Sequence, residues 1–156
     1  LAGIAFGGAG CHLPHGMSYA VAGLVKDYRP KDYPQAKPMV PHGMAVILNA
    51  PSVYRWTASG CPDRHLHGAE CLGADVRDAA PADAGEVVAK RIIAMMKETL
   101  VPNGLAQLGF GEADVAEFSH HLFQQRGGHH IAGERVHAAI VLRDGASLTA
   151  DELTAP

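Results

Sequence analysis

The segment 83–99 constrains the fold most, because it carries the clearest periodic pattern in the chain. Apolar residues recur there at three- and four-residue spacing, namely Val87, Val88, Ile92, Met95 and Met96. Charged residues such as Glu86 and Lys90 fall on the opposite side. This arrangement is typical of an amphipathic helix with one buried face. We therefore expect an all-α fold with this stripe in its core.

Glycine and proline divide the rest of the sequence into further helices. These are expected over residues 3–25, 62–72 and 112–118. The glycine-rich first segment should be buried, with close backbone contacts, and Gly73 should end the second. Another helix should begin at Pro41 and break or kink at Pro51. Four prolines in residues 26–41 exclude an uninterrupted helix and predict a surface loop.

The character of the sequence changes after residue 118. Residues 134–143 are rich in β-branched and other apolar residues and predict one strand, which has no obvious partner strand in the chain. We therefore divide the chain into a helical domain, residues 1–118, and a divergent, irregular tail, residues 119–156.

Length and charge narrow the class of protein. A chain of 156 residues with 47% apolar content is long enough for one globular domain. The net charge of -3 and the scattered lysines and arginines provide no basic patch, so neither nucleic acid nor a membrane is an expected partner. No apolar run reaches the roughly 18 residues that a membrane-spanning helix needs.

The three cysteines, Cys11, Cys61 and Cys71, are odd in number and fit no Cys-x-x-Cys spacing. Unpaired cysteines favour a reducing compartment, and we expect a cytoplasmic protein. The chain begins at Leu1, directly in apolar sequence, and we expect it to be part of a longer protein.

Two identical tripeptides mark the candidate site. His15-Gly16-Met17 and His42-Gly43-Met44 each open an apolar segment. An imidazole beside a glycine, where another element can approach the backbone, is well suited to bind a metal. The alternative is that each is an ordinary hydrogen-bonded histidine.

Other histidines have weaker arguments. His12 lies three residues before His15, and we consider a role in a pocket or in orienting a ligand, with simple packing as the alternative. His65 and His67 should face different sides of their helix. Four further histidines lie in a loop-like setting without defined geometry: His120, His121, His129 and His130. Two imidazoles do not complete a metal site, so further ligands are expected elsewhere.

These segments resemble the C-terminal helical domain of iron-containing (group III) alcohol dehydrogenases, a fold of the dehydroquinate synthase-like type. Residues 3–19, 40–44 and 48–51 carry the resemblance, which runs from about Gly3 to Phe118. Within that family the hydroxyacid-oxoacid transhydrogenase branch is the more similar. Gly8 and Ala20 depart from its usual pattern, which has Asn and Pro there.

The resemblance implies a metal, Fe(II) or Zn(II), held by one Asp and three His. It places two of these ligands on His15 and His42, and the other two would precede Leu1. NAD(P) would be bound mainly by an N-terminal domain that this chain does not contain. Tyr19 stands where many family alcohol dehydrogenases have a further histidine near the nicotinamide, which favours the transhydrogenase branch. We therefore name Tyr19 and His12 as candidate catalytic residues.

The implied activity is hydride transfer between a hydroxyacid or alcohol and an oxoacid or aldehyde through the nicotinamide. In the transhydrogenase branch, 4-hydroxybutyrate is oxidised while 2-oxoglutarate is reduced. An NAD-dependent alcohol dehydrogenase is one alternative. A truncated, non-catalytic helical remnant with residual metal binding is another, because the chain lacks a nucleotide-binding motif and is expected to be inactive alone. Homo-oligomerisation stays open for the full-length protein.

Two weaker expectations concern the loop and the tail. Lys26, Arg29 and Lys31 could bind the carboxylate of such a substrate, or could simply form a solvated charged loop. Residues 133–149 resemble a strand and turn from the C-terminal lid domain of adenylate-forming acyl-CoA ligases. They contain no catalytic lysine of that family, and no ligase activity is assigned to them.

Overall fold

The structure is a computed structural model that describes residues 2–31, 33 and 36–124. Every regular element in these ranges is helical and none is a strand, so the prediction of an all-α fold is confirmed. The strand predicted over residues 134–143 lies outside the described residues, as does most of the predicted tail. The boundary at residue 118 stays a prediction.

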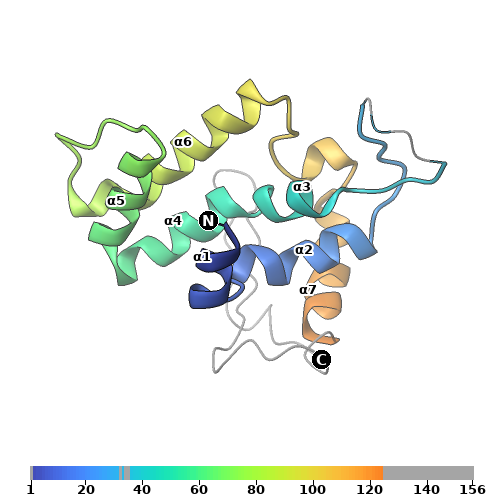
Figure 1. Cartoon of the computed structure of the whole chain (residues 1–156). Helices are drawn as coiled ribbons and strands as arrows, with labels where there is room; N and C mark the ends of the chain where they lie inside the picture. Colours follow the sequence, from blue (N-terminus) through green and yellow to red (C-terminus); the bar gives the residue numbers. More distant parts are fainter. Residues whose placement is uncertain (1, 32, 34–35, 125–156) are drawn as a thin grey trace.

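Seven α-helices make up the described part of the chain. They are α1 (Ala2–Ala9), α2 (Leu13–Gly23), α3 (His42–Ile47), α4 (Ala50–Thr57), α5 (Pro62–Cys71), α6 (Ala84–Glu98) and α7 (Val115–Gln124). Single 3-10 turns connect several of them: η1 (Ala58–Gly60), η2 (Pro81–Asp83), η3 (Leu105–Leu108) and η4 (Glu112–Asp114). Helices α3 and α4 lie in the middle, with α5 and α6 on one side and α2 and α7 on the other (Figure 1).

Helices α4 and α6 approach closely because small residues meet between them. A Cβ atom added to Gly85 would lie 2.9 Å from the Cα of Arg55 and 3.0 Å from the Cβ of Ala58. Arg55 also donates two hydrogen bonds to Glu86, at 2.5 and 3.2 Å. These hydrogen bonds lower the pKa of Glu86 below its ordinary value of 4.5. The contact therefore combines close backbone packing with an ion pair on its exposed edge.

The main core is shared by α2, α3, α4 and α6. Its most buried side chains include Val21, Ala45 and Met96, which are 0%, 1% and 2% exposed. Helix α7 joins this core through Phe118, whose ring meets Phe110 edge to face at 4.7 Å. Because α6 buries one face in this core, its apolar residues repeat with the helical period in the sequence.

An ion pair ties the segment after α2 to η4. The Lys26 ammonium donates a hydrogen bond to the Asp114 carboxylate at 2.7 Å and lies 5.6 Å from the centre of the Phe110 ring. The hydrogen bond from Lys26 lowers the pKa of Asp114 below its usual value. Lys26 therefore has a structural partner in Asp114, and its role in binding a substrate stays a prediction.

The helix boundaries predicted at Pro41, Pro51 and Gly73 are confirmed. Helix α3 follows Pro41, and two residues separate the end of α3 at Ile47 from the start of α4, which has Pro51 in its first turn. Asn49 in this break is buried and donates a hydrogen bond from its side-chain amide to the Ala45 carbonyl at 2.8 Å. Gly73 follows α5 with a φ of +87°, a conformation that favours glycine.

The prediction of one buried helix over residues 3–25 is wrong. Gly10 has a φ of +71° and divides the segment into α1 and α2. Helix α1 is not buried where its side chains are described, since Ile4 is 77% exposed. Added Cβ atoms at Gly3 and Gly7 would meet nothing within 4 Å, so these glycines make no close backbone contact. Periodicity could not predict this, because burial depends on what lies opposite the helix.

Two further findings qualify the predictions. Met95 of the α6 stripe is 36% exposed, whereas Val88, Ile92 and Met96 are buried as expected. Across the described residues, no helix has both the length and the apolar character needed to cross a membrane.

Candidate metal centre and adjoining cavity

His15 is held at the start of α2. His12 is the N-cap residue of this helix, and its carbonyl accepts a hydrogen bond from the His15 amide at 2.9 Å. Pro14 occupies the first turn, where its missing N–H costs no helical hydrogen bond. The buried Ser18 hydroxyl donates to the His15 carbonyl at 2.6 Å. The backbone of His15 is therefore fixed from both sides.

His42 is placed in a similar way at the start of α3. It is the first residue of that helix, directly after the N-cap Pro41, whose carbonyl accepts a hydrogen bond from the Ala45 amide at 2.9 Å. Its side chain is exposed, as is the following Gly43. Both His-Gly-Met steps thus begin helices, as the sequence predicted.

The structure brings these two imidazoles together. The ring centres of His15 and His42 lie 5.4 Å apart, with their planes inclined by 60°. A metal–nitrogen bond of about 2.1 Å puts a ring centre about 3.2 Å from the ion, so a near-tetrahedral pair has centres about 5.2 Å apart. The observed separation is close to this value. Two neutral imidazole nitrogens also match the donor preference of Zn(II) and Fe(II). The ring separation is therefore compatible with both imidazoles binding one divalent ion.

The pair is not a complete coordination sphere. No group of three or more His, Cys, Asp or Glu residues in the described ranges is arranged to hold a metal ion. A stable site for these metals commonly has three or four protein ligands. The described residues thus supply at most a partial set of donors.

A cavity of about 730 Å³ adjoins His15. Its volume lies within the roughly 300–1,000 Å³ typical of small-molecule sites. His12, Tyr54 and His65 form a series of rings along it, with centres 6.2 Å apart for the first pair and 5.8 Å for the second. Arg64 of α5 also lines this space. The cavity therefore extends from the start of α2 to α5.

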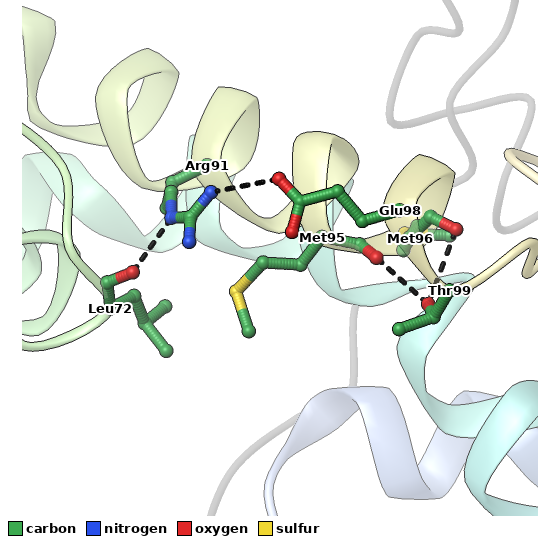
Figure 2. Close-up of polar contacts among 6 residues, drawn as sticks. All are labelled: Leu72, Arg91, Met95, Met96, Glu98 and Thr99. Atoms are coloured by element: carbon green, nitrogen blue, oxygen red, sulfur yellow. Dashed lines mark hydrogen bonds and ion pairs between the residues drawn. The ribbon is translucent and has the colours of Figure 1, made fainter.

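The remaining lining is mainly apolar and comes largely from α3 and α6, including Ile47, Val88, Ile92 and Met96. Figure 2 shows the Met95 side chain extending toward Leu72, beside the polar contacts of Arg91. Arg91 donates to the Leu72 carbonyl at 2.7 Å and to the Glu98 carboxylate at 3.4 Å. Thr99 donates its hydroxyl to the Met95 carbonyl at 2.8 Å. These polar groups thus already have partners within the protein.

The two candidate catalytic residues lie in different places. His12 lines the cavity and stacks on Tyr54 with the ring planes inclined by 11°. Tyr19 is one turn after His15 on α2, is 41% exposed, and does not line the cavity. The structure therefore brings His12, but not Tyr19, into the same space as His15 and Tyr54.

Other predicted site residues remain apart from the pair. His65 contacts Thr57 and Cys61, whereas the His67 ring lies 3.5 Å from the Glu70 carboxylate, so the two histidines have different neighbours. Arg29 and Lys31 are exposed in the loop before α3 and do not line the cavity.

Tyr54 and Arg64 are cavity residues that the sequence reasoning missed. Neither belongs to a spaced motif, and only the packing of α4 and α5 brings them beside His12. Their helices were visible in the sequence, but their shared cavity was not.

The helical fold and the paired histidines agree with a family match. Residues 1–139 match the family model of the C-terminal domain of Fe-containing alcohol dehydrogenases. The chain belongs to the Fe-containing alcohol dehydrogenase family.

Particular relatives narrow the comparison. The chain is 49% identical over 116 residues to the mitochondrial hydroxyacid-oxoacid transhydrogenase of Bos taurus, covering 74% of this chain and 25% of the relative. The Homo sapiens protein of that name is 50% identical over 114 residues, covering 73% and 24%. That of Xenopus tropicalis is 48% identical over 114 residues, covering 73% and 25%. The chain thus spans about a quarter of the length of these curated relatives.

A solved structure has the same fold. The chain superposes on a crystal structure of 1,3-propanediol oxidoreductase with a TM-score of 0.63, covering 79% of this chain and 29% of that one. The sequence identity is 24%, so the likeness supports the fold and not the reaction.

The expectation of a cytoplasmic location is wrong by this comparison. The similar transhydrogenases are all named as mitochondrial. The three cysteines are indeed free and exposed, but unpaired thiols indicate only a reducing environment. They do not identify the compartment that provides it.

Proposed function

We propose that this chain supplies two ligands, His15 and His42, to a divalent metal in a hydride-transferring oxidoreductase. The observation that carries the proposal is the 5.4 Å separation of their ring centres at the start of two packed helices. Fe(II) or Zn(II) suits these donors, and the family to which the chain belongs is named for iron.

The chain's own residues hold the donors in place. The Ser18 hydroxyl bond to the His15 carbonyl restrains the first turn of α2, and the Ala45 amide bond to Pro41 restrains the first turn of α3. When bound, the metal would act as a Lewis acid that polarises the substrate's hydroxyl or carbonyl oxygen. The apolar lining beside His15 offers few hydrogen-bonding partners to water on that side of the site.

The proposed reaction passes a hydride between a hydroxyacid and an oxoacid or aldehyde through a nicotinamide cofactor. The names of the relatives support this substrate class over simple alcohols. By the earlier resemblance the substrates are 4-hydroxybutyrate and 2-oxoglutarate, and NAD(P) is bound mainly by protein outside this chain. His12 is proposed to contact the substrate from the cavity wall. Tyr19, on the exposed side of α2, is proposed as a second catalytic residue.

Calorimetric titration of Zn(II) into the metal-free chain tests the ligand assignment. We expect weak binding that is reduced at least about tenfold in His15→Ala and in His42→Ala, because each variant removes one of two donors. His67→Ala is the matched control, since this exposed histidine on α5 lies outside the pair. Equal affinity in all four proteins would remove the metal proposal.

A further inference from the structure

We propose that Arg64 binds the carboxylate of the substrate in the cavity beside His15. This inference rests on the proposed function, because it assigns the second anchoring point of the same hydroxyacid or oxoacid. Arg64 is the third residue of α5 and lines the cavity together with His65 and Tyr54.

Charge is the first argument. Arg64 is the one Lys, Arg, Asp or Glu residue in the cavity lining that the described residues provide. Within those same residues it forms no ion pair, whereas Arg91 close by bonds to Glu98. A guanidinium without a carboxylate partner, at the edge of a mainly apolar space, favours binding of an anion.

The hydrogen-bonding capacity of the other polar residues is the second argument. The two ring nitrogens of His65 lie 2.9 Å from the Cys61 carbonyl and 2.9 Å from the Thr57 hydroxyl. The Thr99 hydroxyl donates to helix carbonyls. These groups are therefore committed to the protein. The five N–H donors of a guanidinium match the two oxygens of a carboxylate, so Arg64 is the donor best suited to bind it.

The arrangement of rings is the third argument. His12 stacks on Tyr54, and Tyr54 meets His65 edge to face, so two ring contacts lead from the start of α2 to α5. His15 and Arg64 both line the cavity; His15 lies three residues after His12 on α2, and Arg64 precedes His65 on α5. A molecule with an oxygen function at one end, a carboxylate at the other and an apolar chain between them has groups that His15, Arg64 and the apolar lining can each bind.

Glutarate is the probe that separates this proposal from metal binding, because it has the carboxylates but neither a hydroxyl nor a keto group. The chain is stripped of metal with a chelating resin, and glutarate binding is measured by calorimetry for the wild type, Arg64→Gln and Arg77→Gln. We expect saturable binding that is weakened at least about tenfold in Arg64→Gln, since a bidentate charged contact is lost. Arg77→Gln, which changes an exposed arginine paired with Asp75, should stay within about twofold.

Arg64→Lys keeps the positive charge but not the planar guanidinium group that can donate two parallel hydrogen bonds. This variant should bind glutarate with intermediate affinity. Circular dichroism of each variant establishes that the helices are intact. Equal affinity of wild type and Arg64→Gln, or no saturable binding by the wild type, would overturn the inference. If glutarate binding depends on Arg64 while Zn(II) binding is unaffected in His15→Ala and His42→Ala, the metal proposal fails and the carboxylate site stands.

Discussion

The contact between α4 and α6 differs from the contact between the starts of α2 and α3 in what fills it. Between α4 and α6, Gly85 lies directly against the backbone of Arg55 and leaves no room for a methyl group. Between the starts of α2 and α3, two polar imidazoles face each other with their ring centres 5.4 Å apart. The residues of the first contact pack only against one another, whereas the imidazoles of the second contact are also suited to bind a metal ion.

This difference predicts that substitutions in the two regions act on different properties. Those in the packed region, which includes the core around Phe118, should change the free energy of unfolding. Those at the histidine pair should change metal binding and leave the stability of the metal-free chain nearly intact. Five substitutions test this division, in order of decreasing effect on stability.

Phe118→Ala should have the largest effect. Its ring is 6% exposed and packs edge to face on Phe110, so truncation leaves a cavity and separates α7 from the core. We expect a loss of about 3–5 kcal/mol, measured by urea denaturation. Trp56→Ala, at a side chain that is 53% exposed, is the control and should cost less than about 1 kcal/mol. Similar losses for both would mean that α7 is not part of the core.

Gly85→Ala should destabilise the chain by about 1–3 kcal/mol, because the new Cβ must displace the backbone of α4. The matched control is Gly68→Ala within α5, where an added Cβ meets nothing within 4 Å. That change should be stabilising by up to about 1 kcal/mol, since alanine is the better helix former. The comparison fails if both substitutions shift the urea midpoint in the same direction.

Glu86→Gln should alter the dependence of stability on pH. Hydrogen bonds from Arg55 lower the pKa of folded Glu86 below 4.5, so the pair stabilises the folded chain above that pH. This contribution is lost as the pH falls through the lowered pKa of the folded state. Because both side chains are partly exposed, it should be less than about 1 kcal/mol. Urea denaturation between pH 7 and pH 3 should show a smaller stability loss in Glu86→Gln, and an unchanged pH dependence would contradict the assignment.

His15→Ala and His42→Ala should have the smallest effect on the metal-free chain. Their side chains are half-buried and exposed, respectively, and we expect changes within about 0.5 kcal/mol. Thermal unfolding with and without Zn(II) checks this, since added Zn(II) should raise the melting temperature of the wild type more than that of either variant. A loss of several kcal/mol without metal would show that the pair is part of the core.

The sequence predicted most of the helices because their signals are local. Pro41 and Pro51 mark two helix starts, Gly73 follows the end of α5, and the apolar stripe of α6 repeats with the helical period. The exposure of Ile4 and Met95 was not predictable in the same way. Whether an apolar side chain is buried depends on which element lies opposite, and periodicity contains no such information.

The candidate site was predicted in part for the same reason. His15 and His42 were found through a repeated tripeptide step, and the structure places their rings together. Tyr54 and Arg64 carry no repeated pattern and enter the cavity only through the packing of α4 and α5. The contact of Lys26 with the Asp114 carboxylate at 2.7 Å could not be predicted either, because the two residues lie far apart in the sequence.

X-ray absorption at the zinc edge of the Zn(II)-loaded chain tests the central claim most directly, because it counts imidazoles bound to the ion. We predict about two imidazole ligands at a Zn–N distance of about 2.0–2.1 Å. The count should fall to about one in His15→Ala and in His42→Ala. A spectrum without imidazole scattering, or one that is the same in the wild type and both variants, would contradict the claim that these two helices share one metal ion.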